Sequence, residues 1–357
     1  MATKTKVKAK PAAKAKAKVP AKPKATAMSK PAAMPKPAAK ATPAKPGASA
    51  PDPAKLRALL DDVLANPDDD HARRVYADLL SAHGDPRGDF IAVQCEIAAR
   101  GNRTEREDPK TKPLWERFRE LHSKHSAKWT KPLKALGKHT KWELHRGFVR
   151  ALSPASEEES TTPGALADIL ASEPVIDLEL GEEPRLLAKL LDVAGIERVR
   201  RLGVHGWSPS SGGSFVGKVV GAATRVTGVR ELRLGVKLGD PGVRALLASR
   251  ALGSVTHLAI GGPGTSAKVA EELASSPLGQ QLEILEWNRE EITPALAKAF
   301  IAMPKLKMFV GSDGWVDGTR DLLAERFGDG FVIEDEPGDE YILDGVAGVS
   351  LRKPWKR

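Results

Sequence analysis

The stretch VRELRLGVKLGDPGVRALLASRALGSVTHLAI, residues 229–260, holds one complete copy of the unit that decides the fold. It begins and ends with the same arrangement: an aliphatic residue, two others, an apolar residue, one other and an apolar residue. The segment between the two copies, GVRALLASRALG, has the apolar spacing of a helix. The sequence therefore predicts a strand over 229–234, a helix, and a second strand over 255–260.

The same arrangement recurs on both sides of this unit at a near-regular interval. Its other copies are VRALSP (149–154, degenerate), VIDLEL (175–180), VRRLGV (199–204), LEILEW (282–287) and, more weakly, LKMFVG (306–311). The central apolar residues lie 26, 24, 30, 26, 27 and 24 residues apart: Leu152, Leu178, Leu202, Leu232, Leu258, Leu285 and Phe309. Such a period is typical of proteins built from stacked strand-and-helix units.

This unit resembles a leucine-rich repeat of the helix-backed, ribonuclease-inhibitor-like type. The resemblance spans about residues 147–335 and implies an α/β fold, a solenoid with parallel strands on the concave face and helices on the convex face. The asparagine that usually follows the strand of such repeats is missing. Its place is taken by Trp207, Lys237, Pro263 and Glu290.

Three short amphipathic helices are predicted ahead of the repeats, from Pro51 onward. The segment ANPDDDHARRVYADLLSAHGDPRGDFIAVQCEIA resembles the bacterial repeat-companion domain, a small helical module found ahead of leucine-rich-type repeats, over about residues 54–101. The resemblance brings no catalytic residues with it. We interpret Cys95 as a core residue, and we expect Arg87 to form a structural salt bridge with Asp78.

The sequence divides into five parts. They are a disordered tail (1–50), the helical module (51–103), a basic helical connector (104–146), the repeats (147–335) and a C-terminal cap or tail (336–357). Residues 103–146 hold thirteen lysines and arginines against six acids, with tryptophan and phenylalanine interleaved. We favour core aromatics beneath a solvated cationic face, and contact with nucleic acid remains the alternative.

The tail explains the basic charge of the chain. Residues 1–50 hold thirteen lysines and no acid, so the net charge of +10 leaves about −3 for all that follows. Its Lys, Ala and Pro composition resembles the tails of linker histones, which implies polyanion contact; a solubilising leader is the alternative. The lysines assigned to polyanion contact are Lys4, Lys6, Lys8, Lys10, Lys14, Lys16, Lys18, Lys22 and Lys24.

Strand alternation predicts which side chains a partner could touch. With Leu202 and Val204 inward, Arg201 and His205 point outward. The partner-binding residues predicted on this face are Arg201, His205, Glu231, Arg233, His257, Glu286 and Asn288. This mixture of acids, arginines, histidines and small residues favours contact with a protein over catalysis, and a solvated face without a partner is the alternative.

The favoured function is a non-enzymatic protein-interaction scaffold with a basic tail. The alternative is a nucleoid-associated protein that binds DNA non-specifically through the tail. Neither an enzyme nor a metal or cofactor is expected, because no nucleophile with a base and no ligand cluster is found. GGSFVGKVV, residues 212–220, nearly matches a phosphate-binding loop, but Val219 stands where Ser or Thr ligates magnesium.

Membrane insertion and disulfide formation are not expected either. No apolar run reaches the length of a membrane span, and the basic start is not followed by the core of a signal peptide. The single cysteine, Cys95, excludes an internal disulfide. The expected location is the cytoplasm, with association with the nucleoid under the alternative function.

Overall fold

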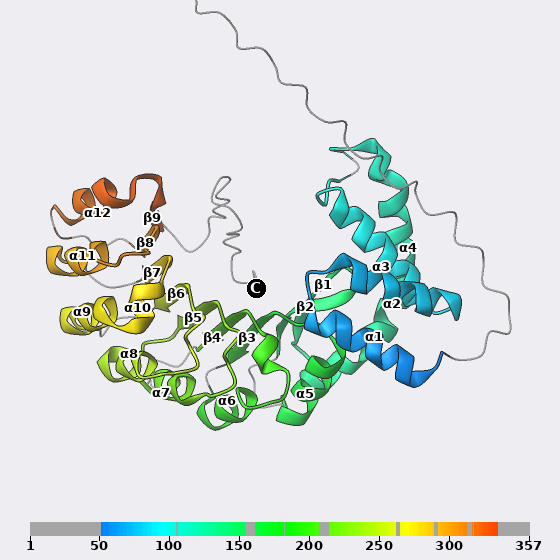
Figure 1. Cartoon of the computed structure of the whole chain (residues 1–357), viewed down its shortest axis with the longest axis horizontal. Coiled ribbons are helices and arrows are strands. Elements are labelled where there is room, and N and C mark those ends of the chain that lie inside the picture. The colour runs from blue at the N-terminus through cyan, green and yellow to red at the C-terminus, as the bar shows by residue number, and fades with distance from the viewer. Residues whose placement is uncertain are drawn as a thin grey trace, which may run out of the picture. The chain divides into compact units, whose positions relative to one another are not determined.

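A computed structural model describes residues 51–104, 106–154, 161–181, 183–206, 214–261, 265–288, 292–312, 316 and 318–334. These residues form a mixed α/β structure in which helices accompany one open sheet (Figure 1). The tail 1–50 with its lysines, the segment 336–357, and Trp207, Pro263 and Glu290 lie outside the described residues. Within the described part of the chain, no helix combines the length and apolar content needed to cross a bilayer.

The N-terminal helices begin where acidic residues cap them. They are α1 (Pro53–Ala65), α2 (Asp70–Ala82), α3 (Pro86–Ala99) and α4 (Lys112–Trp129), with the 3-10 turns η1 (Pro109–Thr111) and η2 (Lys131–Leu136). The side chains of Asp52, Asp69 and Asp85 accept hydrogen bonds from backbone amides in the first turns of α1, α2 and α3. Cys95 is fully buried in the core of this module, and burial raises its pKa to about 11, which keeps the thiol protonated at neutral pH.

Nine strands form one sheet in the order of the sequence. They are β1 (Lys141–His145), β2 (Phe148–Ser153), β3 (Asp177–Gly181), β4 (Arg201–His205), β5 (Glu231–Gly235), β6 (His257–Gly261), β7 (Ile284–Asn288), β8 (Met308–Ser312) and β9 (Phe331–Glu334). β1 pairs with β2 in antiparallel fashion, and each later pair is parallel.

One helix or more connects each pair of parallel strands. These are α5 (Pro163–Ser172), α6 (Pro184–Leu190), η3 (Ile196–Arg198), α7 (Ser214–Ala222), α8 (Gly239–Leu247), α9 (Ala267–Ser275), α10 (Pro277–Gln281), α11 (Pro294–Ile301), α12 (Thr319–Phe327) and η4 (Gly328–Gly330). Helices α5 to α12 lie along one side of the sheet (Figure 1). We call the other side the open face.

The predicted repeat register is confirmed by the strand pairing. Each predicted central residue is the direct neighbour of the next, in the row Leu152, Leu178, Leu202, Leu232, Leu258, Leu285, Phe309 and Phe331. The predicted members of this row are at most 1% exposed and belong to one continuous core with the covering helices. Backbone bonds repeat at the same interval: the carbonyl of Arg200 accepts the amides of Arg230 and Glu231, and the carbonyl of Arg230 accepts those of Thr256 and His257.

The sheet extends beyond the predicted strands at both ends. β1 lies in the segment 104–146, which the sequence assigned to a helical connector. It turns into β2 through Arg146 and Gly147, which have φ values of 53° and 84°, as two-residue hairpins require. At the other end, Phe331 pairs with Phe309, so the chain adds β9 within the predicted repeat region 147–335, after the last predicted strand (306–311).

Arg87 joins the helical module to the sheet. The predicted salt bridge with Asp78 is wrong, because Asp78 is exposed while Arg87 reaches the carboxylate of Glu173 at 2.6 Å. Its guanidinium also lies 4.9 Å from the ring centre of Phe148 and donates to the carbonyl of Gly147. Glu173 in turn accepts the amide of the residue after Phe148, so one ion pair fixes α3 against β2 and α5.

A second link comes from the acidic turn between α1 and α2. Asp68 pairs with Arg200, which precedes β4, and lies 3.7 Å from Arg150 on β2. Asp70 lies 3.2 Å from Arg146 in the β1–β2 turn. The module and the first repeats therefore meet through complementary charges.

Close helix packing explains the near-match to a phosphate-binding loop. Gly217, the last glycine of the GxxxxGK match, faces α8: a Cβ there would lie 2.5 Å from the Cα of Gly242. Gly221, one turn later, faces the backbone of Ala245 with equally little space. These two glycines let the backbones of α7 and α8 approach, which accounts for the motif without a nucleotide. The first glycine of the match, Gly212, lies outside the described residues.

This packing predicts a large difference between two glycine-to-alanine substitutions. Gly217→Ala should lower the free energy of unfolding by about 1–3 kcal/mol, because the new methyl group pushes α7 from α8. Gly164→Ala, on α5, meets nothing within 4 Å and should be neutral or slightly stabilising. Urea unfolding measures both, and equal midpoints would contradict the close approach.

Candidate interaction surface

The open face carries two rows of side chains that run across the strands. In the first row, strand pairing aligns Asp177, Arg201, Glu231, His257, Ile284 and Met308. In the second row it aligns Glu179, Gly203, Arg233, Ala259, Glu286 and Val310. The first row becomes apolar at β7, with Ile284 and Met308, whereas the second row still carries the charged Glu286 on β7 and becomes apolar at β8, with Val310.

The charged residues of these rows form one ionic network. Arg201 donates to Asp177 at 2.7 Å and to Glu231 at 2.6 Å. Arg233 donates to the other oxygen of Glu231 at 2.5 Å and to Glu286 at 3.0 Å. Signs therefore alternate from β3 through β5 to β7, and each guanidinium joins two carboxylates.

His257 completes this network at its buried end. Its Nε2 lies 2.6 Å from Glu286, its Nδ1 lies 3.8 Å from Glu231, and its side chain is 7% exposed. A separate pair joins His205 to Glu179. The two histidines thus pair with different carboxylates. Among the described residues, no three histidine, cysteine or acidic side chains are grouped so that they could hold a metal ion.

Small residues make the network possible. Ala259 lies between Arg233 and Glu286 in the second row, so the guanidinium can cross β6 to reach β7. Gly203 has the same effect for Glu179, because a Cβ there would overlap the carboxylate that extends towards His205. Charged and small residues alternate along this row for a steric reason.

The predicted partner-binding side chains are less exposed than expected. Arg201, His205, Glu231 and Arg233 are half-buried, and His257 and Glu286 are buried. Asn288 aligns with Gly261, and its side chain is not among those described. Asp177, which belongs to the network, and Glu179, which pairs with His205, were absent from the predicted partner-binding set. In the sequence, acidic and basic residues alternate at the same position of successive strands. This alternation of charge could have identified them.

Burial and pairing shift the carboxyl groups of the network in opposite directions. Burial raises the pKa of Asp177, and the charge of Arg201 does not offset it, so that pKa stays above its usual value. Burial also acts to raise the pKa of Glu286, but its hydrogen bond with His257 and the charge of Arg233 outweigh burial and hold that pKa low. The pKa of Glu231 is lowered as well, by Arg233, His257 and Arg201 against burial.

The apolar end of the open face is a separate small cluster. Ile284, Met308 and Val310 are between 2% and 6% exposed, and Val332 of β9 packs against them. Charged and apolar surfaces are thus contiguous on one side of the sheet.

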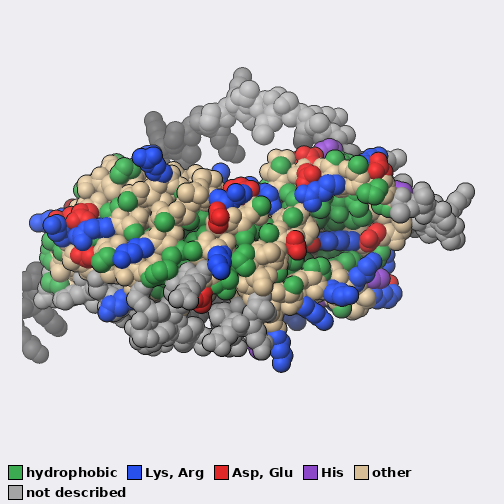
Figure 2. Space-filling model, turned by 90° about the horizontal axis from the view of Figure 1, so that it is seen from below, with side chains coloured by type: hydrophobic (Ala, Val, Ile, Leu, Met, Phe, Trp, Pro, Cys, Tyr) green, Lys and Arg blue, Asp and Glu red, His purple; other side chains and the backbone are tan. Residues whose placement is uncertain are grey.

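Among the described residues, no network of comparable length is found on the helix side. Figure 2 views the molecule from below Figure 1, the side on which α6, α7 and α8 lie, and positive and negative side chains are interspersed there. A groove of about 360 Å³ separates α6 from α7. It is lined mainly by Ala188, Leu191, Val219, Ala222 and Ala223.

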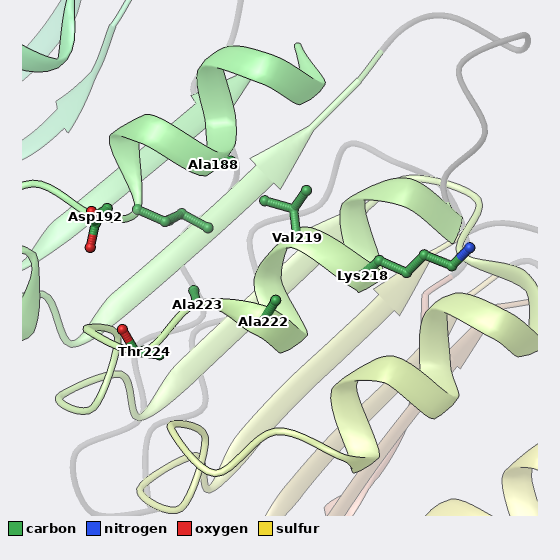
Figure 3. A pocket seen from close by; sticks show the side chains of 8 residues that line it. Ala188, Asp192, Lys218, Val219, Ala222, Ala223 and Thr224 are labelled. Atoms are coloured by element: carbon green, nitrogen blue, oxygen red, sulfur yellow. The ribbon is translucent and has the colours of Figure 1, made fainter.

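The lysine of the stretch that nearly matches a phosphate-binding loop does not point into this groove, as a phosphate ligand would. Lys218 is exposed on α7, and in Figure 3 its amino group points away from Ala188, Ala223 and Asp192. The groove therefore has an apolar floor without a convergent set of donors.

The aromatic residues of the basic connector occupy two environments. Phe118 and Trp129 pack on Phe90 of α3, with ring centres 5.6 Å and 4.6 Å apart, as the core interpretation predicts. Trp142 on β1 is 38% exposed. Five lysines that precede it in the sequence are also exposed: Lys128, Lys131, Lys134, Lys138 and Lys141.

Comparisons with known proteins add little to this geometry. No protein-family model matches the chain, and no curated protein matches it. Among solved structures, it is similar to a crystal structure of a Bacteroides fragilis protein from a structural genomics programme, at 13% sequence identity and a TM-score of 0.27. That alignment covers 48% of this chain and 68% of the other. Function has to be inferred from the side chains of the open face.

The opposite pKa shifts predict opposite effects of two isosteric substitutions on acid stability. In the folded chain the pKa of Glu286 lies below its usual value of 4.5. The ionised side chain therefore stabilises the folded chain above that pH, and this stabilisation is lost as the pH falls. Glu286→Gln should therefore make the loss of stability in acid shallower. Asp177 has a raised pKa when folded, so its protonation favours the folded chain, and Asp177→Asn should make the loss steeper.

Urea midpoints measured from about pH 6 to about pH 3 distinguish the two variants. Glu283→Gln, at an exposed carboxylate paired with Lys307, is the control and should follow the unsubstituted chain. If the slope of urea midpoint against pH changed in the same direction in Glu286→Gln and Asp177→Asn, relative to the unsubstituted chain, the assigned pKa shifts would be contradicted.

Proposed function

We propose that this chain is a non-enzymatic protein-interaction scaffold whose open sheet face holds a protein partner. In this proposal, the strand-and-helix units form a leucine-rich-repeat-like solenoid with the open face concave. The N-terminal helices are a repeat-companion module that fixes the first units through the Arg87–Glu173 pair. In-register strands, helices on one side and the resemblances in the sequence support this architecture.

The observation that carries the proposal is the ionic network of the open face. Its side chains come from β3, β4, β5, β6 and β7 and are held in place by one another before any partner arrives. Partly buried ion pairs contribute little net stability, because desolvation offsets their attraction. Fixed charges beside an apolar cluster, however, suit recognition of a protein surface by charge and shape.

Partner capture tests the proposal with a matched pair of double variants. Arg201→Met with Asp177→Asn removes both ion pairs of Arg201 on the open face, and Glu231 keeps its pair with Arg233. Arg244→Met with Glu272→Gln does the same on the helix side, where Arg244 lies 2.7 Å from Glu272. The first should weaken capture about tenfold, as loss of an interface anchor does, while the second retains it.

The measurement is quantitative pull-down from a lysate of the source organism, with circular dichroism as the control for folding. Equal capture by both double variants would exclude the open face as the binding surface. The network also shows why charge reversal at Arg233 is unsuitable: a carboxylate there would lie between Glu231 and Glu286.

A second candidate function is non-specific DNA binding, in which the lysine-rich tail is the main contact. One observation within the described residues favours it: the segment 128–142 of the connector carries five exposed lysines and the exposed ring of Trp142. Phosphate neutralisation, rather than base recognition, would then supply the affinity.

Deletion of residues 1–50 tests this candidate. The full chain should bind a labelled duplex with affinity that falls steeply with salt, and the chain from Pro51 onward should lose most of that affinity. α1 and its cap Asp52 remain intact in the shortened chain. Equal binding by both chains at low salt would exclude the tail as the DNA contact.

A further inference from the structure

The sheet ends at β1 with an edge that no other described strand covers. β1 is the first strand in the order of the sheet, and β2 is the one described element with which it makes an extensive contact. No hydrogen bond joins the backbone of Trp142 to a described residue outside the sheet. Unpaired amide and carbonyl groups at such an edge can bond a strand of another chain.

The register of the sheet shows which backbone groups lie at this edge. The carbonyl of Arg150 in β2 accepts an amide from the segment that leads into β3, so the polar backbone groups of Arg150 face β3. Those of the next residue, Ala151, face the other way, towards β1, where Ala151 pairs with Glu143. The amide and carbonyl of Trp142, one residue before Glu143, therefore point away from β2 and lie at the free edge.

The side chains along this edge are complementary to themselves. Lys141 and Glu143 carry opposite charges and flank Trp142, and the pairing with β2 is regular over these three residues. Lys141 is exposed, and Trp142 is 38% exposed. When two such strands pair in antiparallel fashion about Trp142, each lysine lies opposite the glutamate of the other strand.

We propose that two copies of this chain associate edge to edge through β1, in the antiparallel register centred on Trp142. The two tryptophans then exchange both backbone hydrogen bonds, and their side chains meet on one face of the joined sheet. Two pairs of Lys141 with Glu143 lie on the other face, in the more closely spaced kind of antiparallel pair. Both copies contribute the same residues, as a two-fold axis requires.

This association should be weak and reversible. The pairing with β2 is irregular between Glu143 and Leu144, which confines the regular edge to three residues. The contact uses no residue of the ionic network, so it is independent of the proposed function.

Charge reversal at the two flanking positions tests the proposal in the full chain, by sedimentation velocity over a range of concentrations. The unsubstituted chain should show a reversible equilibrium between monomer and dimer. Lys141→Glu places glutamates opposite each other at both ends of the contact, and Glu143→Lys places lysines there, so each variant should dimerise about tenfold more weakly. An equimolar mixture of the two variants restores both pairs of opposite charge and should dimerise as strongly as the unsubstituted chain. The double variant, Lys141→Glu with Glu143→Lys, inverts both pairs and should also dimerise.

Lys298→Glu and Glu325→Lys, at exposed positions of α11 and α12, change the charge of the chain by the same amounts and should leave dimerisation unaltered. Circular dichroism identifies the folded variants, and only these are compared. A chain that stays monomeric up to its solubility limit would overturn the proposal, as would dimers that both single reversals leave intact. If neither the mixture nor the double variant dimerised, the proposal would fail as well, because damage to β1 predicts that result and complementary pairing does not.

Discussion

The row of buried residues at the centre of the strands is the constraint on which the rest of the structure depends. Leu178, Leu202 and Leu232 lie side by side on neighbouring strands, and the same row continues to both ends of the parallel sheet. A shift of one residue in any strand would turn charged side chains into the core and aliphatic ones outward. The hydrophobic core therefore fixes the register, and the register fixes which side chains meet on the open face.

The ionic network follows from that register. Asp177, Arg201 and Glu231 are neighbours only because Leu178, Leu202 and Leu232 are. The network is continuous because small residues separate the charged ones in the second row. Since such pairs seldom add net stability, we interpret the network as a surface prepared for recognition rather than as a support for the fold.

The sequence predicted the strands and their alignment, because a buried residue repeated at a near-constant interval is a strong and local signal. It did not predict the ion pairs. Arg87 finds Glu173, which is 86 residues away, and such a partner becomes visible only when the helical module and the first repeats are placed together. A neighbour such as Asp78 is close in sequence but lies exposed on α2.

The outward positions were also predicted, but their burial was not. Alternation along a strand tells which side of a sheet a residue occupies, whereas burial depends on what neighbouring strands contribute. β1 and β9 were not predicted from the sequence, because each is the outermost strand at one edge of the sheet and neither follows the repeated sequence pattern. Gly217 of α7 contributed to the near-match to a phosphate-binding loop because close helix packing and phosphate binding both require a residue without a side chain.

The most direct test of the central claim is urea unfolding of a chain in which the carboxylates and guanidiniums of the network are replaced by neutral residues of similar size. The replacements are Asp177→Asn, Arg201→Met, Glu231→Gln, Arg233→Met and Glu286→Gln. If the network serves recognition, the free energy of unfolding should stay within about 2 kcal/mol of the unsubstituted chain. A loss of more than about 5 kcal/mol would contradict that claim and make the network a principal support of the fold.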